Sequence, residues 1–252
     1  MSSNLPRTSR RAFGLGIAGS LVTGSVASAA PPAPAPKPPA KLSIKPTDAL
    51  LVIDLQNCFV PGGSLAVKDG AAIVPLVNNL AKAFANVVLT QDWHTPDHVS
   101  FASQHAGKKP FETVSLGYGT QVLWPEHCVQ GTTGAALVPG LVVAHARLIL
   151  RKGFHKEVDS YSAFLEADRK TQTGLAGYLR GAGIQRVFLA GLATDYCVAW
   201  SALDARKLGF QAAVIEDACR AIDLNGSLAK AWADLKKAGV LRIQSSDILT
   251  SA

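Results

Sequence analysis

Three residues in distant parts of the chain have the side chains that nucleophilic catalysis needs. Cys197 lies in GLATDYCV (191–198), where a predicted strand turns into a predicted helix. The dipole and the free amides of a first helical turn favour a thiolate, and the same amides can stabilise an oxyanion. Asp54 and Lys152 each follow another predicted strand. An aspartate can take the thiol proton and a lysine can stabilise the charges, so the three side chains suffice for attack on a carbonyl carbon.

Each of these residues also has a structural interpretation. An aspartate after a strand commonly caps backbone amides, and a lysine at a strand end commonly extends to solvent. A cysteine is commonly a small core residue, and we interpret Cys128 and Cys219 in this way because neither begins a predicted helix. The catalytic hypothesis therefore depends on the three residues meeting in space.

A second group of residues has the ligand types of a divalent metal site. Asp92 and His94 are two positions apart, which directs both side chains to one side of an extended segment. His98 follows four residues later, and His127 lies in WPEHC (124–128). One aspartate with two or three histidines suits Zn²⁺, Fe²⁺ or Mn²⁺ and leaves positions open for water or substrate. Taken singly, each histidine is equally explained as a surface or hydrogen-bonded core residue.

From residue 42 onward, apolar runs alternate with amphipathic stretches. The runs predict buried strands at 49–54, 86–91, 147–151, 186–191, 211–216 and 240–244. The stretches predict helices at 71–85, 173–182, 196–208 and 227–238. This alternation predicts an α/β fold, a three-layer sandwich with a mainly parallel, doubly wound sheet of about six strands and helices on both faces. Such sheets bind ligands at the carboxyl ends of their strands, where the candidate residues fall. The stretch 92–144 has no clear period, and a loop of that length is usually functional.

The first 46 residues predict an export signal and a linker. Residues 1–29 hold a twin-arginine pair, Arg10 and Arg11, then a mildly apolar run, then the small-residue cleavage pattern ASA (27–29). The apolar run is shorter than the roughly 20 residues of a membrane span. Residues 30–46 are rich in Pro and Ala and predict an extended linker, so the folded domain covers 47–252. We expect export by the twin-arginine route to the periplasm; the alternative is an irregular cytosolic N-terminus with two chance arginines.

Composition excludes several other classes. The 252 residues are 48% hydrophobic and 17% charged, enough for one sizeable core, which excludes disordered and fibrous proteins. Setting residues 1–29 aside leaves 22 basic against 18 acidic residues, a net charge of +4, without a basic cluster. We therefore expect no nucleic-acid partner. The chain has no CxxC pair, no GxGxxG after the first strand and no GxxxxGK[ST], so structural zinc, dinucleotide and P-loop sites are not predicted.

Seven motifs follow one another along the chain: DLQNCF (54–59), TQDWH (90–94), DHVSF (97–101), WPEHCVQGT (124–132), KG (152–153), DSYSAF (159–164) and GLATDYCV (191–198). Taken in this order, they resemble the nicotinamidase/pyrazinamidase group of the isochorismatase-like cysteine hydrolases. The match runs from about residue 50 to residue 241.

The resemblance implies a metal-dependent amidohydrolase that converts nicotinamide to nicotinate and ammonia through a thioester, with pyrazinamide as a further substrate. Cys197 would be the nucleophile, Asp54 the base and Lys152 the third catalytic residue. The amides of Ala193 and Cys197 would form the oxyanion hole, next to a Leu192–Ala193 peptide bond that is cis in relatives.

The resemblance also implies a cofactor and a substrate pocket. One divalent ion (Zn, Fe or Mn) would rest on Asp92, His94 and His127, with His98 as a fourth candidate ligand. A wall of aromatic side chains would hold the flat pyridine ring, although core packing explains the same residues. These residues are Phe59, Trp93, Trp124 and Tyr161. The expected partners are nicotinamide and the twin-arginine export machinery; a homo-oligomer is left open.

One position departs from the family pattern, since relatives commonly have Asp where this chain has Cys58. A thiol there predicts altered packing near the metal or a disulfide in an oxidising compartment. A bond from Cys58 to Cys197 would make activity redox-dependent. Two other functions stay open: a hydrolase of N-carbamoyl or ureido compounds, and a non-catalytic periplasmic protein that binds nicotinamide or metal.

Overall fold

The computed structural model describes residues 41–248. The predicted export signal and residues 30–40 of the predicted linker lie outside this range. The end of that linker belongs to the folded body, because Leu42 and Ile44 pack against the core and the Leu42 amide donates to the Asp247 carbonyl (2.7 Å). Among the described residues, no helix has the length and apolar character that a membrane crossing requires.

Six strands form one sheet in which every neighbouring pair is parallel. In spatial order they are β5 (Leu148–Lys152), β2 (Asn86–Asp92), β1 (Asp48–Ile53), β6 (Arg186–Leu192), β7 (Gln211–Arg220) and β8 (Leu241–Ile243). The chain winds from β1 through β2 to β5, then crosses to β6 and winds the other way. Ligands of open parallel sheets bind where this direction reverses, which here is between β1 and β6.

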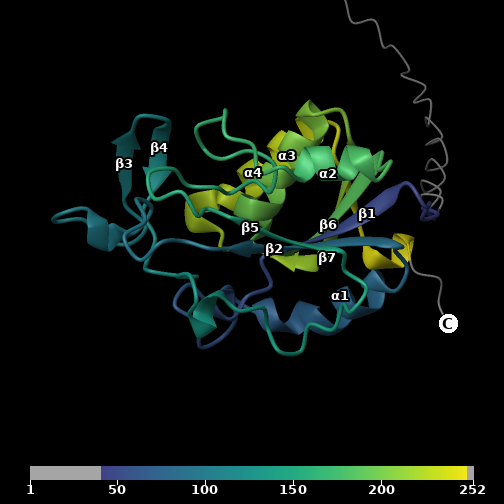
Figure 1. Cartoon of the computed structure of the whole chain (residues 1–252), viewed down its shortest axis with the longest axis horizontal. Helices are drawn as coiled ribbons and strands as arrows, with labels where there is room; N and C mark the ends of the chain where they lie inside the picture. The colour runs from purple at the N-terminus through teal and green to yellow at the C-terminus, as the bar shows by residue number, and fades with distance from the viewer. Residues whose placement is uncertain (1–40, 249–252) are drawn as a thin grey trace, which may run out of the picture. The chain divides into compact units, whose positions relative to one another are not determined.

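Helices cover both faces of the sheet (Figure 1). Residues 41–248 contain the α-helices α1 (Val74–Ala81), α2 (Leu175–Gly181), α3 (Ala199–Lys207) and α4 (Ser227–Lys237). Alternate β1 side chains divide between two cores: Leu50 and Val52 pack in the core that includes α1, and Leu51 and Ile53 in the core that includes α2, α3 and α4. All six β1 residues are buried, as expected for a strand covered on both sides. The predicted three-layer, doubly wound α/β fold is confirmed.

The predicted elements match the observed ones within a few residues, with two differences. β7 runs four residues beyond its predicted end, to Arg220, and the predicted helix 196–208 consists of a π-helical turn (Thr194–Val198) followed by α3. The stretch 92–144 contains an antiparallel hairpin that the sequence analysis missed, β3 (Thr113–Leu116) and β4 (Gly119–Val122). Each of these strands has four residues and is largely exposed, so its hydrophobic pattern is too weak to predict a strand.

Gly191 allows β1 and β6 to pair closely near the strand ends that carry the candidate residues. Its φ of +126° lies in the region that favours glycine, and a Cβ there would lie 2.1 Å from the Ile53 carbonyl oxygen. No side chain fits at this distance, so the sheet must shift to accept one.

We therefore expect Gly191→Ala to lower the free energy of unfolding by roughly 2–4 kcal/mol, because it adds both overpacking and backbone strain. Urea denaturation measures the change. Gly177→Ala is the matched control: in α2 a Cβ at Gly177 meets nothing within 4 Å, so helix propensity should raise stability by up to about 1 kcal/mol. Equal urea midpoints for Gly191→Ala and the parent protein would show that the close contact with the Ile53 carbonyl does not restrict the side chain at position 191.

Candidate active site

Four adjacent strands bring the predicted catalytic and metal-binding residues to one edge of the sheet. Asp54 follows β1, Asp92 ends β2, Lys152 ends β5, and Cys197 lies in the turn after β6. Asp92 and Lys152 are register partners in the β2–β5 pair, which places their side chains next to each other. All four residues are buried.

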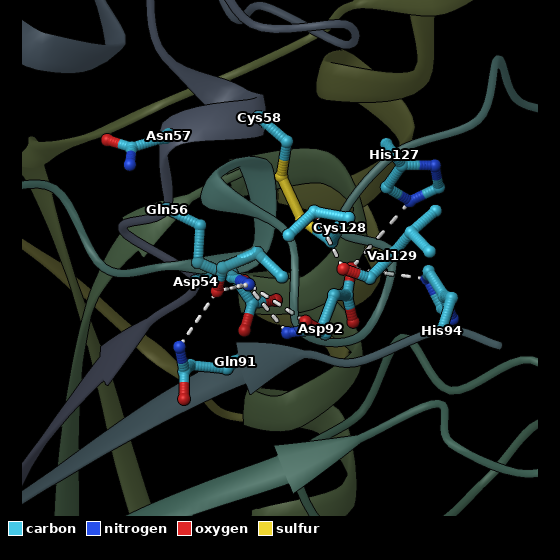
Figure 2. The surroundings of a disulfide bond; sticks show 12 residues. Asp54, Gln56, Asn57, Cys58, Gln91, Asp92, His94, His127, Cys128 and Val129 are labelled. Atoms are coloured by element: carbon cyan, nitrogen blue, oxygen red, sulfur yellow. Dashed lines mark hydrogen bonds and ion pairs between the residues drawn. A yellow bond between two sulfur atoms is a disulfide. The ribbon is translucent and has the colours of Figure 1, made fainter. Parts of the chain in front are cut away.

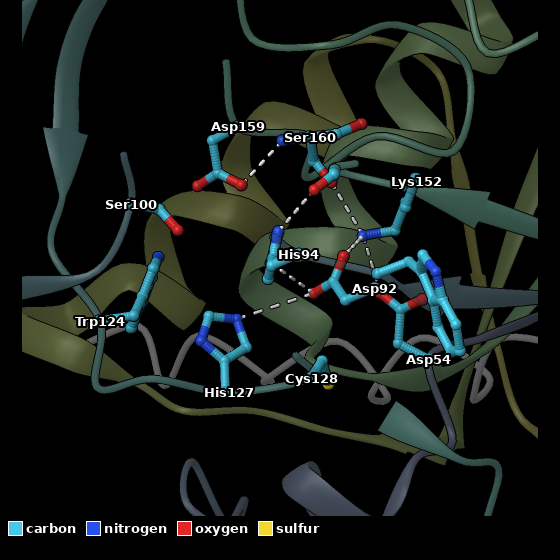
Figure 3. A network of polar contacts seen from close by, with 12 residues as sticks. Asp54, Asp92, His94, Ser100, Trp124, His127, Cys128, Lys152, Asp159 and Ser160 are labelled. Atoms are coloured by element: carbon cyan, nitrogen blue, oxygen red, sulfur yellow. Dashed lines mark hydrogen bonds and ion pairs between the residues drawn. The ribbon is translucent and has the colours of Figure 1, made fainter. Parts of the chain in front are cut away.

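The Lys152 ammonium lies between the carboxylates of Asp54 and Asp92 (Figure 3). Its Nζ donates to Asp92 Oδ1 (2.5 Å) and to the Ser160 carbonyl (2.8 Å). It also lies 2.9 Å from Asp54 Oδ2 and 3.4 Å from Cys197 Sγ. Burial lowers the pKa of Lys152, but the two carboxylates outweigh burial and raise this pKa well above its usual value. Lys152 is therefore charged, and its charge is shared between two acids.

Burial is the main influence on the pKa values of Asp54 and Cys197. Burial raises the pKa of the Cys197 thiol well above its usual value, and Lys152 opposes the rise only in part. The loss of hydration therefore exceeds the stabilisation of the thiolate that the ammonium provides. Burial also raises the pKa of Asp54, against the opposing effect of Lys152. A more basic carboxylate is better suited to accept the thiol proton.

The two oxygens of Asp54 have different surroundings. Oδ1 accepts a hydrogen bond from the Thr90 hydroxyl (2.6 Å). Oδ2 is buried beside the Lys152 ammonium, yet no donor among residues 41–248 is aligned to hydrogen-bond it. Asp54, Asp92 and Cys197 each offer an atom within 4.8 Å of the others. Among the described residues, Asp54 thus keeps one oxygen without an aligned donor, in a carboxylate close to the thiol.

Asp92, His94 and His127 form a compact set of donors. Asp92 Oδ2 lies 3.8 Å from His94 Nε2 and 3.9 Å from His127 Nε2. The Nδ1 atoms of the two histidines donate to the carbonyls of Gly153 (2.8 Å) and Pro125 (2.9 Å). Because a carbonyl only accepts, each Nε2 carries a bare lone pair, the tautomer that metal-binding histidines have.

The protonation of these histidines also fits a metal. Burial lowers the pKa of His94 to about 3 and that of His127 to about 4, so both imidazoles are neutral near pH 7. One carboxylate oxygen and two neutral imidazole nitrogens make a suitable donor set for one divalent ion with open positions.

His98 lies beside this set and not within it. Its Nδ1 is 2.7 Å from the Ser100 hydroxyl, and its Nε2 donates to the Val158 carbonyl (3.3 Å). It forms a neighbouring group with His94 and Asp159, whose donor atoms lie within 4.8 Å of one another. Since both ring nitrogens are occupied, this geometry gives no support to His98 as a fourth ligand.

Two residues position the metal ligands. Gln56, fully buried, accepts from the Asp92 amide (2.8 Å) and donates to the Asp92 and Ala135 carbonyls (2.8 and 2.9 Å). Gly153 has φ +66°, and a Cβ there would lie 2.6 Å from His94 Cε1. The glycine of the KG motif therefore leaves room for the His94 ring. The sequence analysis missed Gln56, although a glutamine two residues after a buried strand was a visible signal.

A cavity lies between the thiol and the metal-binding set. The cavity is narrow, with a volume of only about 20 Å³, so its walls lie close together. This shape favours a small ligand. Its walls come from six apolar or aromatic side chains and five residues of the site: Phe59, Leu65, Trp124, Tyr161, Tyr196 and Ile222, with Asp92, His127, Asp159, Ala193 and Cys197.

The cavity differs from the predicted pocket at several positions. Phe59, Trp124 and Tyr161 line it as expected, but Trp93 does not: its ring packs under the Arg151 guanidinium, 3.7 Å from the ring centroid. Other lining residues come from irregular segments in which no period identifies an inward side chain; these are Leu65, Asp159 and Ile222. Tyr196, which precedes Cys197 in the turn after β6, also lines the cavity and was not predicted to do so.

The Leu192–Ala193 peptide bond is cis, as the resemblance implied. It leads into the π-helical turn that holds Cys197, a type of turn that is frequent at functional sites. Ala193 and Cys197 both face the cavity, and their amides as oxyanion donors stay a prediction.

The cysteines pair in a way that the sequence did not predict. Cys58 and Cys128 form a disulfide, and Cys197 and Cys219 are free. The suggested Cys58–Cys197 bond is therefore wrong. Cys128, interpreted from sequence as structural, lies next to a metal-binding histidine.

Comparison with known proteins agrees with this geometry. The model of the isochorismatase domain matches residues 48–247. A nicotinamidase of Acinetobacter baylyi is 58% identical over 201 residues, 80% of this chain and 94% of that protein. A nicotinamidase of Escherichia coli is 41% identical, covering 77% of this chain and 93% of that protein.

Solved structures are similar as well. A nicotinamidase and pyrazinamidase of Acinetobacter baumanii superposes with a TM-score of 0.81 at 59% identity, over 81% of this chain and 99% of that one. A pyrazinamidase of Pyrococcus horikoshii in complex with zinc gives a TM-score of 0.63 at 35% identity, over 79% and 99% of the two chains. With the domain match across most of its length, the chain belongs to the isochorismatase family.

Proposed function

We propose that this protein is a nicotinamidase, a metal-dependent amidohydrolase that converts nicotinamide to nicotinate and ammonia and also accepts pyrazinamide. The observation that carries the proposal is one narrow cavity faced by the Cys197 thiol on one side and by Asp92 and His127 on another. The names of the similar proteins support the same substrate class.

Cys197 and Asp54 perform the proton and bond changes. Cys197 Sγ attacks the carboxamide carbon while the thiol proton passes to Asp54 Oδ2, the acceptor that lacks a hydrogen bond. Asp54 then returns this proton to the leaving nitrogen, which departs as ammonia and leaves a thioester. Water, deprotonated by Asp54, attacks the thioester carbon and releases nicotinate and the thiol. The charged Lys152 stabilises the carboxylate through these transfers.

The metal-binding set and the aromatic walls hold the substrate. When bound to Asp92, His94 and His127, a divalent ion would supply a Lewis acid next to the cavity. The pyrazinamidase of Pyrococcus horikoshii was solved in complex with zinc, which supports a metal of this kind. Trp124 and Tyr196 meet edge to face (4.9 Å between centroids) and Trp124 donates to the Tyr161 hydroxyl (3.0 Å), which keeps this wall rigid. A rigid aromatic wall suits a flat heteroaromatic ring.

Replacing the nucleophile tests the thioester route. We expect Cys197→Ala to lower nicotinamide turnover by roughly 10³-fold or more while nicotinamide still binds, because only the bond-forming atom is lost. Ammonia release measures turnover, and acid quenching followed by mass spectrometry detects an acyl adduct on Cys197 of the parent enzyme. Cys219→Ala, the other free buried cysteine, should keep the parent rate. A Cys197→Ala rate above a few per cent refutes the route; turnover of N-carbamoyl compounds alone refutes the substrate.

Removing the metal tests the donor set. We expect a chelator to weaken nicotinamide binding by removing the metal. We expect His127→Ala to lower the metal content, because the substitution removes the Nε2 lone pair that would bind the ion. Elemental analysis before and after reloading with zinc, iron or manganese measures both content and identity. His145→Ala is the control, since His145 is exposed and its ring hydrogen-bonds to the Ala81 carbonyl, away from the metal-binding set. Unchanged kinetics in metal-free enzyme would contradict this assignment.

The N-terminal segment supports a proposal of export through the twin-arginine route to the periplasm. Replacing Arg10 and Arg11 together by Lys should leave the precursor in the cytoplasm, because the route recognises the paired guanidinium groups. Immunoblots of cell fractions measure the distribution, with Arg7→Lys as the matched control. Normal periplasmic recovery of the double variant counts against this route.

A further inference from the structure

The Cys58–Cys128 disulfide lies next to the metal-binding set (Figure 2). Its Cα atoms are 5.7 Å apart and 70 residues apart in sequence, and both cysteines are almost completely buried. Cys58 belongs to the 3₁₀ turn Asn57–Phe59, four residues after Asp54. Cys128 directly follows His127. The bond therefore links the loop of the base to the loop of a metal ligand.

Cys128 is connected to both histidines of the set. His127 is its neighbour in the chain, and the His94 amide donates to the Cys128 carbonyl (3.1 Å). The Gln130 amide donates back to the His94 carbonyl (2.9 Å), so that 128–130 and His94 form a short parallel bridge. A displacement of Cys128 would thus move both imidazoles.

Cys58 is connected to the third ligand. Its turn begins after Gln56, whose side chain binds both the amide and the carbonyl of Asp92. The Phe59 amide donates to the Gln56 carbonyl (3.1 Å), and the Cys58 carbonyl accepts from the Leu65 amide (3.0 Å). The disulfide therefore joins the segment that fixes the aspartate to the segment that carries the histidines.

The backbone at Cys128 needs such support. Its φ of +46° lies in the left-handed region, which is unfavourable for a residue other than glycine. Such a conformation persists when its surroundings fix it. Without the bond, Cys128 is free to relax toward an ordinary φ and to carry His127 out of line with Asp92.

We infer that the Cys58–Cys128 disulfide positions the metal ligands, so that the affinity of the site for a divalent ion depends on the redox state of this pair. The inference rests on the metal-binding set of the proposed function. In an oxidising compartment the pair is bonded and the site binds its ion tightly. In a reducing compartment the two thiols leave the ligand loops unlinked, and the ion is held more weakly.

A disulfide that closes a loop of 70 residues also stabilises the fold, because it restricts the unfolded chain. A purely structural role would change the unfolding midpoint and leave metal affinity in the folded protein unchanged. Metal affinity measured well below the unfolding midpoint therefore separates positioning from general stabilisation.

The experiment compares zinc affinity in three proteins that circular dichroism shows to be folded: the parent, a Cys58→Ala/Cys128→Ala double variant and Cys219→Ala. Competition with a chromophoric chelator gives the dissociation constant for zinc. We expect zinc to bind the double variant 10–100-fold more weakly, the usual loss when residues that hold metal ligands in place are replaced. Cys219→Ala should bind zinc as tightly as the parent protein.

Chemical reduction of the parent protein makes the same test with every side chain present. A water-soluble phosphine attacks one sulfur of the metal-free protein, the S–S bond breaks, and water converts the phosphorus adduct to phosphine oxide, leaving two thiols. After gel filtration without oxygen, the thiols counted in unfolded protein should rise from two to four. Zinc affinity should fall as in the double variant, and the phosphine should not affect the double variant.

Three outcomes decide the inference. Four reactive thiols in the untreated, air-purified protein would show that the disulfide is absent. Equal zinc affinity in the folded protein with the disulfide and in the folded protein without it would show that the disulfide does not position the ligands. Either result overturns the inference. Redox-dependent zinc affinity supports it, and if the zinc-loaded protein releases no ammonia from nicotinamide, the proposed function fails while this inference stands. If the double variant does not fold, the reduced parent protein gives the answer.

Discussion

The buried ammonium of Lys152 is the interaction on which the site depends. It faces Asp92 Oδ1 and Asp54 Oδ2, in a position without solvent. Removing one partner of such a group leaves an uncompensated charge that costs about 3–5 kcal/mol. The other oxygen of Asp92 faces His94 and His127. One carboxylate is thus shared between the catalytic residues and the metal-binding set, and neither can be displaced without disturbing the other.

The parallel sheet produces this arrangement. Because β2 and β5 pair in register through Asp92 and Lys152, the acid and the ammonium emerge side by side, and Asp54 emerges from the next strand along the sheet. The turn after β6 then brings Cys197 across the position where the winding direction reverses. The close β1–β6 contact at Gly191 and the hydrogen bonds of Gln56 hold these strand ends together.

The sequence predicted what depends on local pattern. Fully buried strands such as β1 and β6 are continuous apolar runs, and polar residues at their ends, such as Asp54, are exceptions that stand out. It could not predict what depends on the path of the loops: the hairpin β3–β4, the inward position of Ile222, or the pairing of Cys58 with Cys128 over 70 residues. Nor could it predict the effect of burial on Cys197, which raises the pKa of the thiol against the opposing effect of Lys152. Trp93 has the right type and motif, yet packs under Arg151.

A double-mutant cycle between Lys152→Met and Asp54→Asn, read as the free energy of unfolding in urea, tests the role of the ammonium most directly. Lys152→Met alone leaves two buried carboxylates uncompensated and should destabilise strongly. Adding Asp54→Asn removes one of these charges, so we predict that the double variant is more stable than Lys152→Met by more than about 1 kcal/mol. Additive losses, with the double variant less stable than either single variant, would contradict the account.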